Sequence, residues 1–233
     1  MNYYKILNEN EWHRGMCYRT GWNVDIKPFN PYGNCETGGL YYAREDILAF
    51  LEYGSWIRKV TIPSFAQVYC NPGYPKKWKA QQIILGERKR ITTKIIQKLI
   101  EEGANSIYLT QIWTSRHIIN NWNFEELDEF FSTFSSHMGH LSDFLIYAHR
   151  TRCCNLIKLI FKHFKPSPDN IQQMILRLIQ NNYHDALECL LNNLTPIQVQ
   201  ACFIQSLKVA QRQDRFTCAD IISQRHDVVF HKA

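Results

Sequence analysis

The sequence predicts an α+β N-terminal module over residues 1–92, followed by an all-α array of helical repeats over residues 93–233. Short β-favouring runs separated by turn residues fill the first part of the chain, and an apolar helical pattern recurs about every 31 residues in the second. Charge divides in the same way. Residues 1–96 hold 14 Lys and Arg against 8 Asp and Glu, whereas residues 97–233 hold 13 against 13. We therefore expect two modules with different surfaces.

The N-terminal module is expected to be a small sheet that carries one helix. Strands are favoured by the runs MCYRTGWNV, GGLYYA, WIRKVTIP, AQVY and AQQIIL. The stretch REDILAFLEYG, residues 44–54, has apolar residues at helical spacing, acids in its first turn and a terminal glycine, which indicates a helix. The loop FNPYGNCETGG is rich in turn residues. A loop of this kind is a common place for a ligand site.

The helical pattern places apolar residues at positions i, i+3 and i+4 of each unit, which share one face of a helix. Its first positions are Ile96, Leu127, Leu156, Leu187 and Cys218, with offsets of 31, 29, 31 and 31 residues. Further columns at the same spacing are Leu145, Leu176 and Leu207, and Ala148, Ile179 and Ala210. Two columns in each unit predict two helices, so we expect about five helical pairs that bury their faces by stacking. An ordinary helical bundle is the alternative.

A resemblance to a known family supports this architecture. The stretch IIQKLIEEGANSIYL, residues 95–109, resembles the second helix of an ankyrin repeat and its exit, although later units lack the Thr-Pro-Leu-His-type opening. Upstream, the elements YKILN, GWNVD, PFNPYGNC, GGLYYA and KWKAQQIIL are similar to a leader domain that precedes degenerate ankyrin-like repeats in proteins of large amoeba-infecting DNA viruses. The resemblance implies the architecture and a setting inside an infected cell, and it implies no biochemical activity.

Binding of a protein partner is the function that this architecture favours. Stacked helical repeats present a continuous surface, and a standard interface needs about 20–30 residues on each side. The resemblance implies a host or viral protein as the partner. The chain has no apolar run of about 18 residues and no secretory signal at its start. We therefore expect no membrane contact and a location in the host cytoplasm or nucleus.

An alternative function is the binding of nucleic acid or another polyanion. The segment at residues 76–94 has seven basic residues and one acid, Glu87. Basic side chains contact phosphates, and a tryptophan can stack on a base. A solvated face or a contact for an acidic protein explains the same segment. The candidate polyanion-binding residues are Lys76, Lys77, Trp78, Lys79, Arg88, Lys89 and Arg90.

A second alternative is a small-molecule site in the N-terminal module. Arg19 after Tyr18, followed by the GGLYYA run, resembles the order of elements in ADP-ribosyltransferases. The late strand carries neutral amides at positions 81 and 82, where that chemistry needs a carboxylate, so an enzyme is the less favoured interpretation. The candidate ligand-site residues are Tyr18, Arg19, Asn34, Gly38, Gly39 and Tyr41.

Neither a cofactor nor a metal is expected. His137 and His140, followed by His149, Cys153 and Cys154, lack the paired spacing of zinc ligands. The sequence contains no phosphate-binding GxxxxGK[ST] loop, no dinucleotide fingerprint and no HExxH motif. Catalytic residues are therefore not assigned.

Overall fold

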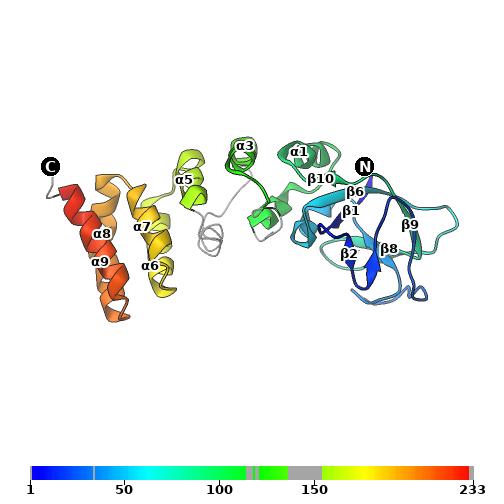
Figure 1. Cartoon of the computed structure of the whole chain (residues 1–233), viewed down its shortest axis with the longest axis horizontal. Helices are drawn as coiled ribbons and strands as arrows, with labels where there is room; N and C mark the ends of the chain where they lie inside the picture. Colours follow the sequence, from blue (N-terminus) through cyan, green and yellow to red (C-terminus); the bar gives the residue numbers. More distant parts are fainter. Residues whose placement is uncertain (1, 34, 114–117, 119–120, 136–153, 231–233) are drawn as a thin grey trace. The chain divides into compact units, whose positions relative to one another are not determined.

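The chain contains sheets in its N-terminal part and helices in its C-terminal half (Figure 1), which confirms this much of the predicted fold class. The structure is a computed structural model that describes residues 2–33, 35–113, 118, 121–135 and 154–230. It divides into two compact units, residues 1–130 and 131–233. The predicted boundary at residue 92 marks the change from strands to helices, and as a domain boundary it stays a prediction.

Strand β6 (Trp56–Thr61) is the central strand of the N-terminal unit. One edge of it pairs antiparallel with β1 (Tyr3–Leu7) over five register positions. The other edge is shared by β9 (Gln82–Leu85), which extends to β4 (Gly21–Val24), and by β10 (Lys89–Arg90). Because β6 is paired along both of its edges, its backbone is held in the middle of the sheet.

A second sheet has the order β5 (Leu40–Tyr42), β8 (Lys77–Ala80) and β7 (Val68–Asn71). A bridge between Tyr4 and Ala43 joins it to β1. The two sheets share an apolar core, whose buried members are Leu7, Tyr18, Leu40, Tyr42, Val60, Ala80, Ile83 and Leu85. Burial of this core ties β5 and β8 to the five-stranded sheet.

A tight hairpin joins β2 (Trp12–His13) to β3 (Met16–Cys17). Its two turn residues, Arg14 and Gly15, both have positive φ angles of 52° and 83°. Such angles define the type I′ turn that suits the twist of a two-residue hairpin. Glycine adopts this conformation freely, whereas an arginine is strained in it. The turn therefore holds Arg14 in a position that its backbone preference does not explain.

A buried ion pair attaches this hairpin to β6. Arg58 is 4% exposed, and its Nε and Nη2 atoms donate to the two carboxylate oxygens of Glu11 at 2.6 and 2.9 Å. A further nitrogen of Arg58 donates to Thr20 Oγ1 at 2.8 Å. Paired charges that satisfy their hydrogen bonds are tolerated inside a protein, whereas a single one is strongly disfavoured.

The N-terminal unit differs from the sequence prediction in its helix and in four strands. The predicted helix at residues 44–54 is a 3₁₀-helix, η1 (Ile47–Tyr53), which still buries its apolar positions Ile47, Leu48 and Leu51. Strands β1, β2, β8 and β10 were not expected, and β2 and β10 have only two residues each. Strands β1 and β8 carry buried lysines, which the alternation of apolar residues does not reveal, and long-range pairing with β6 and β5 stabilises them.

Three further helical elements complete the first unit, and the last of them contains the division between the units. They are α1 (Thr93–Glu101), η2 (Ser106–Trp113) and α3 (Phe124–Phe134). Tyr4 donates its hydroxyl to the Glu102 carboxylate at 2.8 Å, which ties the end of α1 to strand β1. Trp122 donates its indole N–H to the Ile91 carbonyl oxygen at 3.0 Å. The first predicted repeat helix is therefore packed on the sheets.

The second unit consists of stacked helices. Figure 1 shows α6 to α9 side by side, and neighbouring helices in this set pack on one another. The helices are α5 (Cys154–His163), α6 (Pro168–Gln180), α7 (His184–Asn192), α8 (Pro196–Arg212) and α9 (Phe216–Phe230). Ser167 caps α6 and Thr195 caps α8, each followed by a proline at the first helical position.

Burial follows the predicted 31-residue spacing. All five starting positions of the first column are buried, and Leu187 and Cys218 are 0% exposed. In the predicted column of Leu145, Leu176 and Leu207, the buried positions lie one residue earlier than predicted. Leu176 and Leu207 are only half-buried, whereas the neighbouring Ile175 and Ser206 are buried. Leu145 and Ala148 lie outside the described residues.

The two helical pairs α6–α7 and α8–α9 turn in the same way. Asn182 and Asp214 have φ angles of 58° and 53°, and in each turn the next N–H bonds to the carbonyl oxygen five residues earlier. This geometry closes a helix in the Schellman motif. Side chains from the later pair then satisfy the ends of the earlier one. Arg215 reaches the Gln180 carbonyl oxygen at 3.5 Å, and Arg225 reaches that of Leu191 at 3.1 Å.

Replacement of a buried column residue is predicted to destabilise the helical unit. Leu190→Ala should lower the free energy of unfolding by about 2–5 kcal/mol, because the cavity it leaves lies in a close-packed interior. Ile204 is 64% exposed on a neighbouring helix, so Ile204→Ala should change the value by less than about 0.5 kcal/mol. Urea unfolding followed by far-ultraviolet circular dichroism measures both. Equal effects of the two variants would contradict the proposed core.

Loss of the charge on Glu11 is predicted to be costly. Glu11→Gln leaves the Arg58 guanidinium buried without its carboxylate, so we expect a loss of about 3–5 kcal/mol in the free energy of unfolding. The same change at the exposed Glu52 serves as the control and should alter stability by less than about 0.5 kcal/mol. Chemical denaturation of both variants provides the measurement. A Glu11→Gln protein as stable as wild type would show that the ion pair does not hold the hairpin.

Candidate functional site

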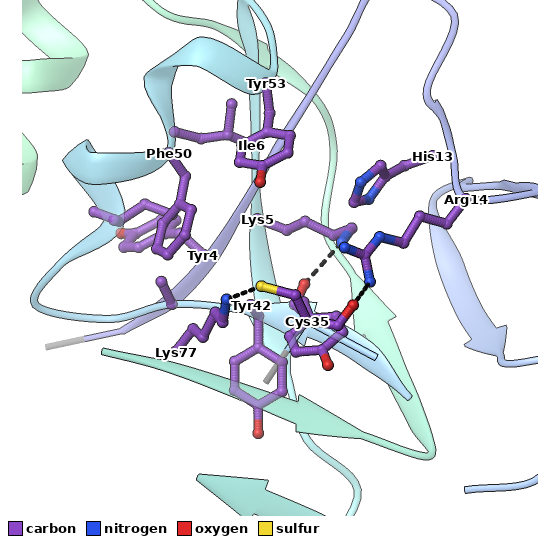
Figure 2. Close-up of a pocket in the computed structure, with 13 residues that line it drawn as sticks. Tyr4, Lys5, Ile6, His13, Arg14, Cys35, Tyr42, Phe50, Tyr53 and Lys77 are labelled. Atoms are coloured by element: carbon purple, nitrogen blue, oxygen red, sulfur yellow. Dashed lines mark hydrogen bonds between the residues drawn. The ribbon is translucent and has the colours of Figure 1, made fainter. Parts of the chain in front are cut away.

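The N-terminal unit contains a pocket that is open to solvent and lies where elements of both sheets meet. Its walls come from strands β1, β2, β5 and β8, from the hairpin turn, from the loop before β5 and from η1. Figure 2 shows the side chains that line it. The lining residues are Tyr4, Lys5, Ile6, His13, Arg14, Cys35, Tyr41, Tyr42, Ala43, Ile47, Phe50, Tyr53 and Lys77. We call this the Lys5 pocket.

Lys5 is the most deeply buried cation of the pocket. Its side chain is 4% exposed, and its Nζ donates to the Tyr41 carbonyl oxygen at 2.7 Å and lies 4.3 Å from the centre of the Tyr18 ring. Burial, assisted by the nearby charge of Arg14, lowers the pKa of Lys5 to about 7. Lys5 is also the register partner of Arg58 on β6, so both side chains leave the sheet on the same face.

Basic side chains gather around Tyr41. Arg14, Lys77 and Lys79 each place their charged group 5.6 Å from the centre of the Tyr41 ring. Arg14 also donates to the carbonyl oxygen of Cys35, and Lys77 Nζ contacts the Cys35 sulfur (Figure 2). The face of an aromatic ring attracts cations. Tyr41 thereby brings together cations that would otherwise repel one another.

His13 lies beside this cluster and is neutral at physiological pH. Burial, with the charges of Lys5 and Arg14, lowers its pKa to about 4. Its ring meets that of Tyr53 edge to face, with 5.5 Å between the centres. His13 is therefore a neutral hydrogen-bonding group in a pocket of positive charge.

A second, smaller depression adjoins the Lys5 pocket and shares His13, Arg14 and Tyr41 with it. Four of the residues expected from the sequence to bind a ligand line this depression, namely Tyr18, Gly38, Gly39 and Tyr41. Arg19 is exposed and lines neither space, and Asn34 lies outside the described residues. Whether these residues bind a ligand stays a prediction.

The two glycines of that set have structural roles. A Cβ on Gly38 would lie 2.5 Å from the Pro28 carbonyl oxygen, and one on Gly39 would lie 3.0 Å from the Lys79 side chain. The N–H of Gly39 donates to the Asp25 carboxylate at 2.6 Å. Both glycines therefore close the loop before β5 and make room for a buried lysine.

The basic segment at residues 76–94 is spread over two sheets. Lys79, on β8, is fully buried and donates to the Tyr32 carbonyl oxygen at 2.7 Å. Trp78 is half-buried against the rings of Tyr3 and Tyr42. Lys79 is therefore covered, whereas Trp78 is partly covered.

The remaining basic residues of the segment differ in their surroundings. Arg90, on β10, forms an ion pair with Glu126. Arg88 is exposed and lies 4.2 Å from the centre of the Trp56 ring. Lys76 and Lys89 are exposed, and Lys77 is half-buried in the Lys5 pocket. Polyanion binding stays a prediction, and Lys76, Arg88 and Lys89 are the exposed residues that could take part in it.

Of the histidines and cysteines weighed as metal ligands, Cys154 is exposed at the start of α5. His137, His140, His149 and Cys153 lie outside the described residues. Within the part of the chain that the structure describes, no three His, Cys, Asp or Glu side chains are grouped in a way that would hold a metal ion. Among the described helices, none is long and apolar enough to cross a membrane.

The helical unit presents an apolar surface on the first helix of each pair. Ile197 is 83% exposed and Ile204 is 64% exposed, and both lie on one face of α8 because they are seven residues apart. The half-buried Leu176 of α6 and Leu207 of α8 border this face. We call these four residues the α6–α8 face.

The chain thus combines sheets that hold a cationic pocket with a stack of paired helices. Three proteins of Acanthamoeba polyphaga mimivirus are similar to it in sequence. R229, which is named an ankyrin repeat protein, is 36% identical over 88 residues, or 33% of this chain and 27% of R229. R868, also named an ankyrin repeat protein, is 32% identical over 111 residues, or 44% of this chain and 54% of R868.

The third relative, the uncharacterized protein R869, is 32% identical over 118 residues, or 47% of this chain and 82% of R869. The chain belongs to the giant-virus family that contains these three proteins, as the sequence motifs predicted. The chain spans only 27% and 54% of the lengths of R229 and R868. No family model matches the chain. No solved structure matches it either.

Burial of Lys5 predicts an unusual dependence of stability on pH. Between pH 7 and pH 9 the unfolded chain, with an ordinary lysine pKa of 10.5, binds more protons at this group than the folded chain does. The free energy of unfolding should therefore rise with pH in this window, by up to about 1.4 kcal/mol for each pH unit. The groups that face Lys5 are Arg14, His13, Tyr18 and Tyr41.

Urea unfolding at pH 7, 8 and 9 measures this rise. Lys5→Met should abolish it, whereas Lys59→Met, at an exposed position on β6, should keep the wild-type slope. The same slope in all three proteins would show that Lys5 keeps an ordinary pKa in the folded chain.

Proposed function

We propose that the chain is a viral protein-binding module whose helical half, built as degenerate ankyrin-like repeats, holds a protein partner. Two relatives, R229 and R868, are named as ankyrin repeat proteins. The 31-residue spacing of buried positions and the matched turns of α6–α7 and α8–α9 support repeats from about residue 93 onward. Because the relatives are proteins of a virus of amoebae, the partner would be a host or viral protein in the cytoplasm or nucleus.

The α6–α8 face is the observation that carries this proposal. Leu176 and Leu207 occupy equivalent positions 31 residues apart, so the half-exposed apolar column repeats with the same spacing as the core. A position that only served the core would be covered by the neighbouring helix. Apolar side chains that stay partly exposed in register supply the kind of surface that a protein partner covers.

The surroundings of the α6–α8 face are of mixed polarity. Gln173, Gln200 and Ala201 are exposed and carry no charge, whereas the exposed Lys208 follows Leu207 and the half-buried Arg177 follows Leu176. Binding to phosphates relies on several Lys and Arg, whereas the centre of a protein interface is depleted in charge. The four apolar residues of the face itself are closer in composition to an interface centre than to a phosphate-binding surface.

Two acidic substitutions on this face are predicted to abolish partner binding. Ile197→Asp combined with Ile204→Asp places charge where a partner would bury apolar surface, so capture of that partner should fall at least about tenfold. Val228→Asp, at a position 47% exposed on α9, is the matched control and should retain the partner. Quantitative affinity capture of the full chain from nuclease-treated lysate of infected amoebae measures all three proteins.

Circular dichroism must first show that the variants keep the wild-type helix content. A partner captured equally by all three proteins would exclude the α6–α8 face. Capture that disappears with nuclease treatment would instead support the polyanion alternative, which substitution of the exposed Arg88 and Lys89 by Glu then tests. A lysate from which no protein is enriched over a tag-only control would contradict the protein-binding function.

A further inference from the structure

The Lys5 pocket contains positive charge without matching negative charge. Lys5, Arg14 and Lys77 line it, and no Asp or Glu is present among its described lining residues. The contrast with the neighbouring position on β6 is informative. Arg58, opposite Lys5 in the register, has the carboxylate of Glu11 against it, whereas the hydrogen bond that Lys5 donates is to a carbonyl oxygen. The fold therefore neutralises Arg58 with an acid in direct contact, whereas the acids nearby, Asp25 and Glu36, line the adjoining depression that shares Arg14 and do not line the Lys5 pocket itself.

The free energy of the empty pocket depends on this imbalance. Moving an ammonium group out of water is strongly unfavourable unless an opposite charge accompanies it. Arg14 adds a second cost, since its positive φ of 52° is a conformation that arginine disfavours. Neither feature is needed to close the hairpin, because an asparagine at the turn and an apolar residue on β1 would satisfy the backbone equally well. The charge on Lys5 becomes favourable when an anion enters, and the turn keeps the Arg14 guanidinium in place to meet that anion.

The side chains of the pocket walls indicate which chemical groups the ligand carries besides the anion. Aromatic and aliphatic side chains surround the cations, and Figure 2 shows Phe50 and Tyr53 of η1 on the side of the pocket that faces Lys5. The remaining apolar and aromatic wall residues are Tyr4, Ile6, Tyr42, Ala43 and Ile47. A simple inorganic ion would contact the cations and leave these walls to water. A flat apolar body attached to the anion would cover them.

The number of cations favours a doubly charged group. Lys5 and Lys77 each supply an ammonium, and Arg14 supplies a guanidinium fork. A phosphate monoester carries about −1.5 to −2 charges at neutral pH and has three acceptor oxygens. Charge-assisted hydrogen bonds to such oxygens are about twice as strong as neutral ones. A carboxylate would neutralise fewer of the three cations.

We propose that the Lys5 pocket binds a small aromatic phosphate monoester, with the phosphate held by Lys5, Arg14 and Lys77 and the ring covered by the side chains of η1. The proposal does not depend on the protein-binding function of the helical unit. His13, neutral beside the cations, is placed to accept or donate a hydrogen bond to the ligand. The site differs from the depression at Tyr18, Gly38 and Gly39, although Arg14 and Tyr41 border both.

Isothermal titration calorimetry of the full chain with phenyl phosphate tests the proposal. Inorganic phosphate carries the charge without the ring, and phenol carries the ring without the charge. We expect phenyl phosphate to bind at least about tenfold more tightly than either, because each probe lacks one half of the recognition. No binding of phenyl phosphate at concentrations up to 10 mM would overturn the proposal. Equal affinity for phenyl phosphate and inorganic phosphate, or for phenyl phosphate and phenol, would also overturn it.

Two variants locate the binding. Arg14→Asn removes the cation and suits the type I′ turn, so it should weaken binding at least about tenfold while the thermal midpoint is kept or raised. Arg19→Ala removes an exposed arginine near the hairpin that lines neither space, and it should leave affinity within about twofold. Equal affinity of the Arg14→Asn protein and wild type would place the ligand elsewhere and overturn the assignment.

Proton uptake gives an independent readout. An anion beside Lys5 favours its charged form, so at pH 8 binding of phenyl phosphate should take up protons. Titrations in two buffers with different ionisation enthalpies measure the number of protons. We expect a positive value in wild type that is lost in Lys5→Met. Proton uptake that is unchanged in Lys5→Met would show that Lys5 does not contact the phosphate.

Discussion

The buried pair of Arg58 and Glu11 is the interaction on which the N-terminal unit depends. Strand β6 is paired along both edges, so Arg58 has no freedom to turn toward water. Its charge must be neutralised where it lies, and Glu11 reaches it from the segment just before the hairpin. The pair thereby fixes the hairpin against the sheet. Because Glu11 neutralises Arg58, the hairpin that follows Glu11 is held where His13 and Arg14 line the Lys5 pocket.

The helical unit depends on a different constraint, since each pair of helices must cover the apolar face of the previous pair. The first column is buried throughout, and Arg215 and Arg225 reach back to carbonyl oxygens of helices one pair earlier. Stacking of this kind fixes which positions are covered and which are left over. Leu176 and Leu207 are half-exposed in the two pairs α6–α7 and α8–α9, so the apolar positions that stay partly exposed follow the same periodicity as the core.

The sequence predicts what depends on local patterns. The 31-residue columns and the strands rich in β-branched or aromatic residues have signals within a few residues or at a constant spacing. Strands β1 and β8 have no such local signal, because Lys5 and Lys79 interrupt their apolar positions. A lysine in a sequence resembles a surface residue. Only pairing with strands far away in the chain buries these two, and no local pattern contains that information.

Long-range pairing also explains why the sequence indicated the basic segment and did not indicate the pocket. Charges that are adjacent in sequence suggest a surface patch. Side chains alternate along a strand, so Lys77 and Lys79 share one face of β8, where Lys77 lines the pocket and Lys79 is buried. Lys76, just before the strand, is exposed. Lys5 and Arg14 then join Lys77 from separate elements. The basic excess of the N-terminal half is therefore partly directed inward. A fold that concentrates unmatched cations among aromatic walls favours one small anion over a long polyanion, whose phosphates would need those charges on the surface.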